Sequence, residues 1–160
     1  MFRYRIAANF LISLIFIFSI PAGAADFIVT NLNDSGVGSL RQAIIDAESL
    51  SVDSNNTIRF QSGLSGTINL TSGELTATVI AVNGIIGFRF RSLTIEGPGA
   101  NIISISGNNT SRIFHIKEQR NIRLGGGAVI SGLPLKEGYA PYGGAIFNER
   151  TLAVRNCRIS

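Results

Sequence analysis

Short apolar runs separated by glycine, asparagine and serine fill most of the chain, and this pattern predicts β structure. Runs such as TIRF, GTINL, LTIEG and IISISG are rich in β-branched residues and end at turn-forming residues. No second helical pattern lies between these runs, which excludes a fold that alternates strands with helices. We therefore expect an all-β fold after the first part of the chain.

One stretch near the start follows a helical period instead. Its apolar residues fall at i, i+3, i+4 and i+7 and form one face: Leu40, Ala43, Ile44 and Ala47. Ser39 precedes them as an N-cap, and Gln42 three residues later completes a capping box. The sequence predicts a helix from Ser39 to about Ser49, which must pack on another element because it is short.

The strand-like runs recur at a nearly constant distance, which indicates a repeat. SLTIEG begins at Ser92, NIRLGG at Asn121 and TLAVRN at Thr151, so their starts are almost evenly spaced. RIFHI begins at Arg112 and GAIFN at Gly144, which is a similar spacing. A third family joins ISISG, AVISG and the final RIS. A period of about 30 residues with three short strands predicts a β-solenoid.

Alternate residues of each strand would then point inward and stack as apolar ladders along the axis. The expected inward residues are Leu93, Ile95, Ile122, Leu124, Leu152 and Val154. The first coil would leave this core open at its end, with unpaired backbone groups beside it. The amphipathic helix that precedes the first coil is suited to cover that end.

Four pieces of the sequence together resemble a known group of proteins: FIVTNLNDSGVGSLRQAI, SGTINLTSGEL, LTIEGPGANIISISGNN, and GGAIFN followed by LAVRNCRIS. They are similar to the N-terminal region of exported bacterial proteins built on a right-handed parallel β-helix, a region marked by a Cys-Ser-Leu-Arg-Glu-Ala motif. GGAIFN is also similar to repeats of chlamydial polymorphic outer membrane proteins, which are autotransporter passengers. Gly38 stands where the motif has Cys, and Gln42 stands where it has Glu.

The resemblance covers about residues 26–160, although TATVIAVNGIIGFRFR is longer than the matching segment of the family. It implies a pectate-lyase-like superhelix that is exposed outside the cell. It also implies that longer members carry a separate anchor or sorting domain, which we do not find in this sequence.

The first residues have the order of an export signal. Two arginines precede the apolar stretch FLISLIFIFSI, and PAGA follows it with a helix-breaking Pro21 and small residues at Ala22 and Ala24. We expect cleavage between Ala24 and Ala25. An uncleaved anchor is the alternative, because residues 6–25 carry no charge.

Composition and charge narrow the function classes. The 160 residues are 45% apolar and 15% charged, which suits one globular domain. Without Arg3 and Arg5 the net charge falls from +4 to 12 − 10 = +2, too weak to indicate nucleic-acid binding. Cys157 is the only cysteine, so no internal disulfide forms; we expect a packing role, with pairing between chains as the alternative.

The chain offers little for catalysis. Polysaccharide lyases and glycosidases need clustered carboxylates, but no Asp follows Asp53. The glutamates of the repeat region do not recur at its period: Glu74, Glu96, Glu118, Glu137 and Glu149. His115, the only histidine, is expected to be a packed or surface residue. We expect no catalytic residue, no cofactor and no metal site.

The sequence thus predicts a signal peptide over residues 1–24, a cap over 25–56 and β-helix coils over 57–160. The coils stop inside a strand pattern, so we expect a truncated reading frame or a fragment of a longer protein. The cap residues are Ser39, Leu40, Gln42, Ala43 and Ile44. We expect an exported, secreted or cell-surface module with a structural or adhesive role. A host surface or a glycan is its expected partner, and we also expect self-association through the last coil. The alternative is the first part of a polysaccharide lyase or glycosidase whose catalytic coils lie elsewhere.

Overall fold

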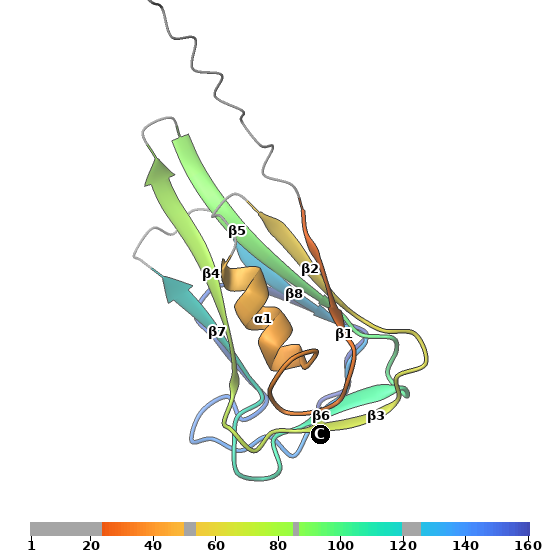
Figure 1. Cartoon of the computed structure of the whole chain (residues 1–160). Coiled ribbons are helices and arrows are strands. Elements are labelled where there is room, and N and C mark those ends of the chain that lie inside the picture. Colours follow the sequence, from red (N-terminus) through yellow and green to blue (C-terminus); the bar gives the residue numbers. More distant parts are fainter. Residues whose placement is uncertain (1–23, 50–53, 85–86, 120–125) are drawn as a thin grey trace, which may run out of the picture.

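The computed structural model describes residues 24–49, 54–84, 87–119 and 126–160, and shows a mostly β protein with parallel sheets and one helix (Figure 1). Residues 1–23 of the expected export signal lie outside the described residues. NIRLGG is likewise outside them except for its last glycine.

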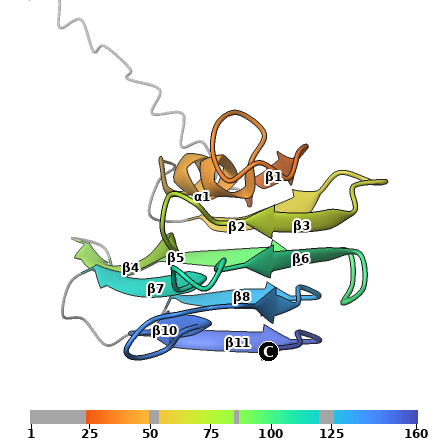
Figure 2. The same ribbon diagram turned by 90° about the horizontal axis from the view of Figure 1, so that it is seen from below.

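The strands form three stacks of parallel neighbours. The first stack contains β1 (Asp26–Val29), β2 (Asn55–Phe60), β5 (Gly87–Glu96), β8 (Gly127–Ser131) and β11 (Thr151–Arg155). The second contains β3 (Gly66–Asn69), β6 (Ile103–Ser106) and β9 (Leu135–Lys136). The third contains β4 (Leu75–Gly84), β7 (Phe114–Gln119) and β10 (Ile146–Asn148). Figure 2 shows successive strands of each stack lying one below another.

The register of the first stack aligns inward apolar residues across all five strands. Phe27 pairs with Ile58, Ile58 with Ile95, Ile95 with Ile130, and Ile130 with Val154. Ile58, Ile95 and Ile130 are at most 1% exposed. Parallel pairing with a period of two along each strand keeps such residues on one face, so they form a continuous core.

The expected strand families are corrected in part. Leu93 pairs with Ala128 of AVIS, so AVIS rather than NIRLGG stacks on LTIE, and AVIS does not join ISIS. The steps along one ladder are uneven, since Val154 follows Ile130 much sooner in the sequence than Ile130 follows Ile95. The loops between strands differ in length, so the stacked strands keep their register although their spacing in the sequence varies. A fixed period therefore assigns some strands to the wrong stack.

One expected family agrees with the structure, and a second agrees in part. RIFHI and GAIFN stack, because Phe114 pairs with Ile146, and these residues have the same offset as the starts of the two runs. The final RIS continues the ISIS family, because Ile105 pairs with Leu135 and Leu135 forms a bridge with Ile159.

The long segment TATVIAVNGIIGFRFR forms an antiparallel hairpin that the repeat did not predict. The end of β4 and the start of β5 pair from Ile80 with Arg91 to Gly84 with Gly87. The hairpin projects beyond the stacks (Figure 1) and joins the first and third stacks into one sheet.

The helix predicted from Ser39 to Ser49 is present as α1 (Leu40–Ser49). Its four predicted apolar residues are all buried, and it packs against β1, β2 and β4. Figure 2 shows it at the β1 end of the stacks. The buried Asn56 of β2 donates its amide hydrogen to the carbonyl oxygen of Ala47, 2.8 Å away, which fixes the C-terminal part of α1 on the first sheet.

The described strand β2 begins at Asn55, slightly before the expected start of the coils at residue 57.

Candidate functional site

A network of polar and charged side chains lies on the outer face of the third stack. The register places Thr76 of β4, His115 of β7 and Phe147 of β10 in one row. Because Phe114 and Ile116 point into the core and are fully buried, alternation directs His115 outward. Glu74 precedes β4 and Glu149 follows β10, so both carboxylates reach this row from the ends of neighbouring strands.

His115 lies between the two carboxylates. Its Nδ1 is 2.9 Å from Glu74 Oε1, and its Nε2 is 3.0 Å from Glu149 Oε1. The side chain of His115 is only 11% exposed. The Phe147 ring covers it edge-on, with ring centroids 5.1 Å apart.

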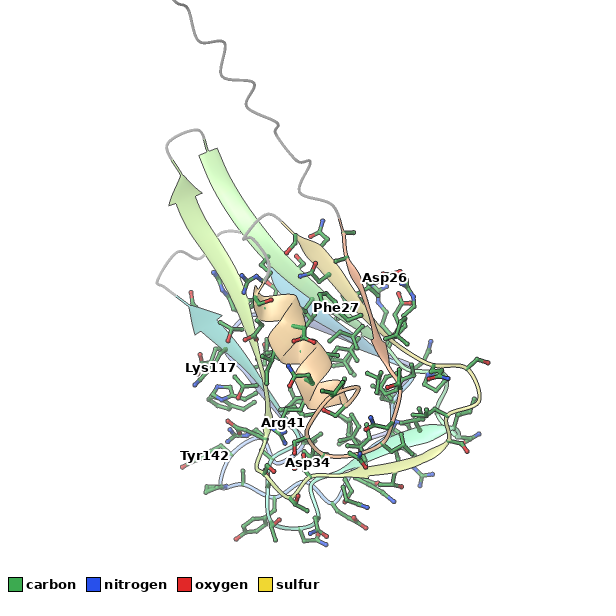
Figure 3. All side chains as sticks on the ribbon, viewed as in Figure 1. Asp26, Phe27, Asp34, Arg41, Lys117 and Tyr142 are labelled. Carbon is green, nitrogen blue, oxygen red and sulfur yellow. The ribbon has the colours of Figure 1, made fainter. Side chains whose placement is uncertain are left out.

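Arg112 completes the network on the Glu74 side. Its Nη1 is 2.6 Å from Glu74 Oε2. Its Nε and Nη2 donate to the carbonyl oxygens of Gly143 and Tyr142, each 3.0 Å away. The guanidinium also stacks over Phe147 at 4.9 Å from the ring centroid. Arg112 therefore holds the loop between β9 and β10, whose exposed Tyr142 lies at the outside in Figure 3.

Glu149 is held on its other side by the backbone. The amide of Glu118 donates to Glu149 Oε2 at 3.0 Å. This hydrogen bond, followed by the one with His115, lowers the pKa of Glu149. Its carboxylate is therefore ionised at neutral pH.

The polar atoms of the His115 network bond to one another and to neighbouring protein groups. Both nitrogens of His115, both oxygens of Glu74 and both oxygens of Glu149 have partners within the protein. A general acid or base needs a proton or a lone pair directed at a substrate, whereas the imidazole here fills the space between the carboxylates. The arrangement is suited to tie three strands together.

Two of the glutamates that do not recur at the repeat period are nevertheless brought together by the fold. Glu74 and Glu149 meet at His115, although they are far apart in the sequence. Glu96 instead pairs with Arg59, 3.0 Å away, on the first stack. The signal that would have placed Glu74 and Glu149 together is the RIFHI–GAIFN register, since each glutamate lies just outside a strand of that stack.

Only one of the two reciprocal hydrogen bonds of the predicted capping box forms. The Gln42 amide donates to Ser39 Oγ at 3.1 Å, as an N-cap requires. The Gln42 side chain, however, donates to Asp46 Oδ1, and the Ser39 amide donates to the carbonyl oxygen of Gly36. The reciprocal bond of the box is therefore absent, because the tight turn before Ser39 already occupies its amide.

Gly38 lies in that turn at a φ of 80°, and a Cβ there would come within 2.2 Å of Thr30 Oγ1. The family that the sequence resembles has Cys at the position of Gly38. A Cys side chain at this position would require Thr30 to move.

Cys157 has an unoxidised thiol that packs partly against the core, as expected. Within the described ranges, no group of three or more His, Cys, Asp or Glu side chains is placed to hold a metal ion. No helix in the part of the chain that the structure describes has the length and apolar character needed to cross a bilayer. Comparisons with models of protein families, with curated proteins and with solved structures found no match to the chain.

Proposed function

We propose that the protein is an exported, non-enzymatic module built as a right-handed parallel β-helix, with a structural or adhesive role at a cell surface. The observation that carries this proposal is the five-strand ladder from Phe27 to Val154. Three stacks of parallel strands visited in the same order in successive turns of the chain are the geometry of a β-solenoid, and right-handed crossovers are the rule for parallel strands. Long polar side walls around a continuous core give binding area without a deep pocket.

The helix supports the same proposal. It covers the β1 end, where the first strand would otherwise present an open core and unpaired backbone groups. Terminal repeats of solenoids need such a cover. Of the expected cap residues, Leu40, Ala43 and Ile44 are buried and Ser39 precedes the helix as its N-cap.

The alternative is the first part of a polysaccharide lyase or glycosidase. Its support is the pair of carboxylates, Glu74 and Glu149, on one face of the stack. Because His115 engages both of them, the network favours a structural role.

Engineered disulfides test the stacking. In a Cys157→Ser background, Thr57→Cys with Thr94→Cys should oxidise readily, because these residues are direct partners on β2 and β5. Thr57→Cys with Ser92→Cys is the matched control, since Ser92 pairs with Asn55 instead. Equal crosslinking of both pairs, or none of the first, would contradict the parallel register on which the β-helix rests.

Export and lack of catalysis are tested on the full chain expressed with residues 1–24. The exported product should begin at Ala25. Incubation with acidic polysaccharides and Ca²⁺ should give no cleavage products. Cleavage that disappears in Glu149→Gln would favour the enzymatic alternative.

A further inference from the structure

A shallow depression of about 500 Å³ crosses the outer face of the second stack, away from the His115 network. Its lining comes from β3, β6, β9 and the last residues of the chain, so it runs along the stack rather than along one strand. Its volume falls within the range of small-molecule sites, about 300–1,000 Å³. Figure 1 shows β3 and β6 on the side of the molecule opposite to the projecting hairpin.

Two cations and no acidic side chain line this depression. Lys136 ends β9, and Arg158 lies beside it, because the Leu135 amide donates to the Arg158 carbonyl oxygen at 2.7 Å. The nearest acidic neighbour in sequence, Glu137, is engaged elsewhere through Ser106 Oγ. Ser160 also lines the depression.

The rest of the lining has the mixed character of a sugar-binding surface. Thr67 Oγ1 and Ser104 Oγ lie 2.9 Å apart and each has a remaining capacity to bond a ligand hydroxyl. Asn101 adds an exposed amide. Ile102, which is 44% exposed, and Pro134 supply apolar surface on which the C–H face of a sugar ring can rest.

We infer that this depression binds an anionic oligosaccharide, with Lys136 and Arg158 on its carboxylate or sulfate groups and Thr67, Ser104 and Asn101 on its hydroxyls. Charge complementarity selects the acidic class over neutral glycans. The elongated lining selects a chain over an isolated anion, since it runs across β3, β6 and β9, and Arg158 and Lys136 are displaced from each other along neighbouring strands. This inference deepens the proposed adhesive role and rests on it for its biological use.

Titration calorimetry of the chain from Ala25 to Ser160 with a heparin-derived tetrasaccharide tests the inference. The probe carries both carboxylate and sulfate groups. We expect Lys136→Ala with Arg158→Ala to weaken binding by at least about tenfold. The matched control is Lys117→Ala with Arg155→Ala, which removes the same charge from exposed residues of the other two stacks and should leave affinity within about twofold. Lys117 is labelled on β7 in Figure 3.

Other probes separate the possible outcomes. Maltotetraose, a neutral chain, and inorganic sulfate should both bind much more weakly than the tetrasaccharide.

Equal losses in both double variants would show diffuse electrostatic attraction and overturn the site. Equal binding of maltotetraose or of sulfate would overturn the anionic-chain assignment. None of these outcomes changes the disulfide test, so failure of this site and failure of the β-helix proposal are distinguishable.

Discussion

The guanidinium of Arg41 donates a hydrogen bond to the backbone carbonyl oxygen of Glu74, 2.8 Å away, and so joins the first turn of α1 to the residue before β4. It also donates to the Gly73 carbonyl oxygen at 2.7 Å and to Asp34 Oδ1 at 2.6 Å. Asp34 in turn accepts from the amide of Ser72 at 2.7 Å. Figure 3 labels Arg41 and Asp34 close together near one end of the helix.

Arg41→Ala should lower the free energy of unfolding by about 3 kcal/mol, because it leaves several partly buried acceptors without their charged donor. Arg41→Lys should recover less than half of this loss, since an ammonium group cannot reproduce the planar fork. Denaturant unfolding measures the free energy of unfolding of both variants. The control is Arg155→Ala, an exposed arginine whose loss should change that free energy by less than about 0.5 kcal/mol. A loss in Arg41→Ala no larger than in the control would show that α1 is held by its apolar face alone.

Asp34 makes stability depend on acid. Burial by itself would raise the pKa of Asp34, but the hydrogen bonds from Arg41, Ser72 and Thr71 outweigh it and lower the pKa from 3.8 to about 2. A lowered folded-state pKa stabilises the protein above pH 4, and the stabilisation is lost as the pH falls toward 2.

We expect Asp34, whose side chain is only 9% exposed, to contribute about 2 kcal/mol at neutral pH, and Asp34→Asn to remove that part of the acid dependence. Unfolding curves at pH 2, 3, 4 and 6 measure it. Parallel pH profiles for the two proteins would contradict the assigned linkage.

Three structural predictions from the sequence are accurate where local pattern and burial coincide. The helix face, the Ser39 cap and the inward alternation of LTIE depend on neighbouring residues, so periodicity is enough to find them. The sequence did not predict the pairing of LTIE with AVIS, because the loops between successive strands differ in length. Nothing periodic in these loops indicates their length.

The antiparallel hairpin and the His115 network were missed for a different reason. Segment 76–91 has strand composition throughout, and composition does not distinguish one long hairpin from two coils. Glu74 and Glu149 meet only after the register of three strands is fixed, which makes their contact a tertiary property. A lone histidine and scattered glutamates give no such signal in the sequence.

The ladder predicts a contrast between two of its members. Ile95→Ala should destabilise the protein by about 3 kcal/mol, because Ile95 is 1% exposed and its truncation leaves a cavity between Ile58 and Ile130. Val154→Ala, at the far end of the same ladder, should cost less than about 1 kcal/mol because Val154 is 41% exposed. Thermal unfolding of both variants checks this. Similar losses would mean that a further layer covers Val154.

The His115 network predicts coupled losses. Glu74→Gln and Glu149→Gln should each lower the free energy of unfolding by about 1–2 kcal/mol, since each removes one of the two carboxylate partners of the imidazole. The double variant should lose less than the sum, because both substitutions act on the same ring. Glu96→Gln, on the exposed pair with Arg59, is the matched control and should be nearly neutral. Strict additivity across the cycle would show that the two carboxylates do not act through His115.

The far end of the stacks predicts self-association of the chain from Ala25 to Ser160. Among the described strands, β11 pairs only with β8, so its other edge presents unpaired backbone groups. Val154 lies on β11 and is 41% exposed, and Ile159, which follows β9 in the second stack at the same end, is 58% exposed. An uncovered edge with apolar side chains favours pairing with another chain.

Because α1 covers the opposite end, we expect two copies to meet through their β11 ends, and such a two-fold contact closes as a dimer rather than a filament. Light scattering after size exclusion should give dimers at micromolar concentration. Val154→Lys with Ile159→Lys should give monomers, because edge lysines oppose strand pairing. Ile45→Lys is the matched control, since Ile45 is 52% exposed on α1 at the covered end. Cys157→Ser should leave the dimer intact if backbone pairing rather than a disulfide joins the copies. A monomer for the unmodified chain would mean that the β11 edge is protected in the folded protein.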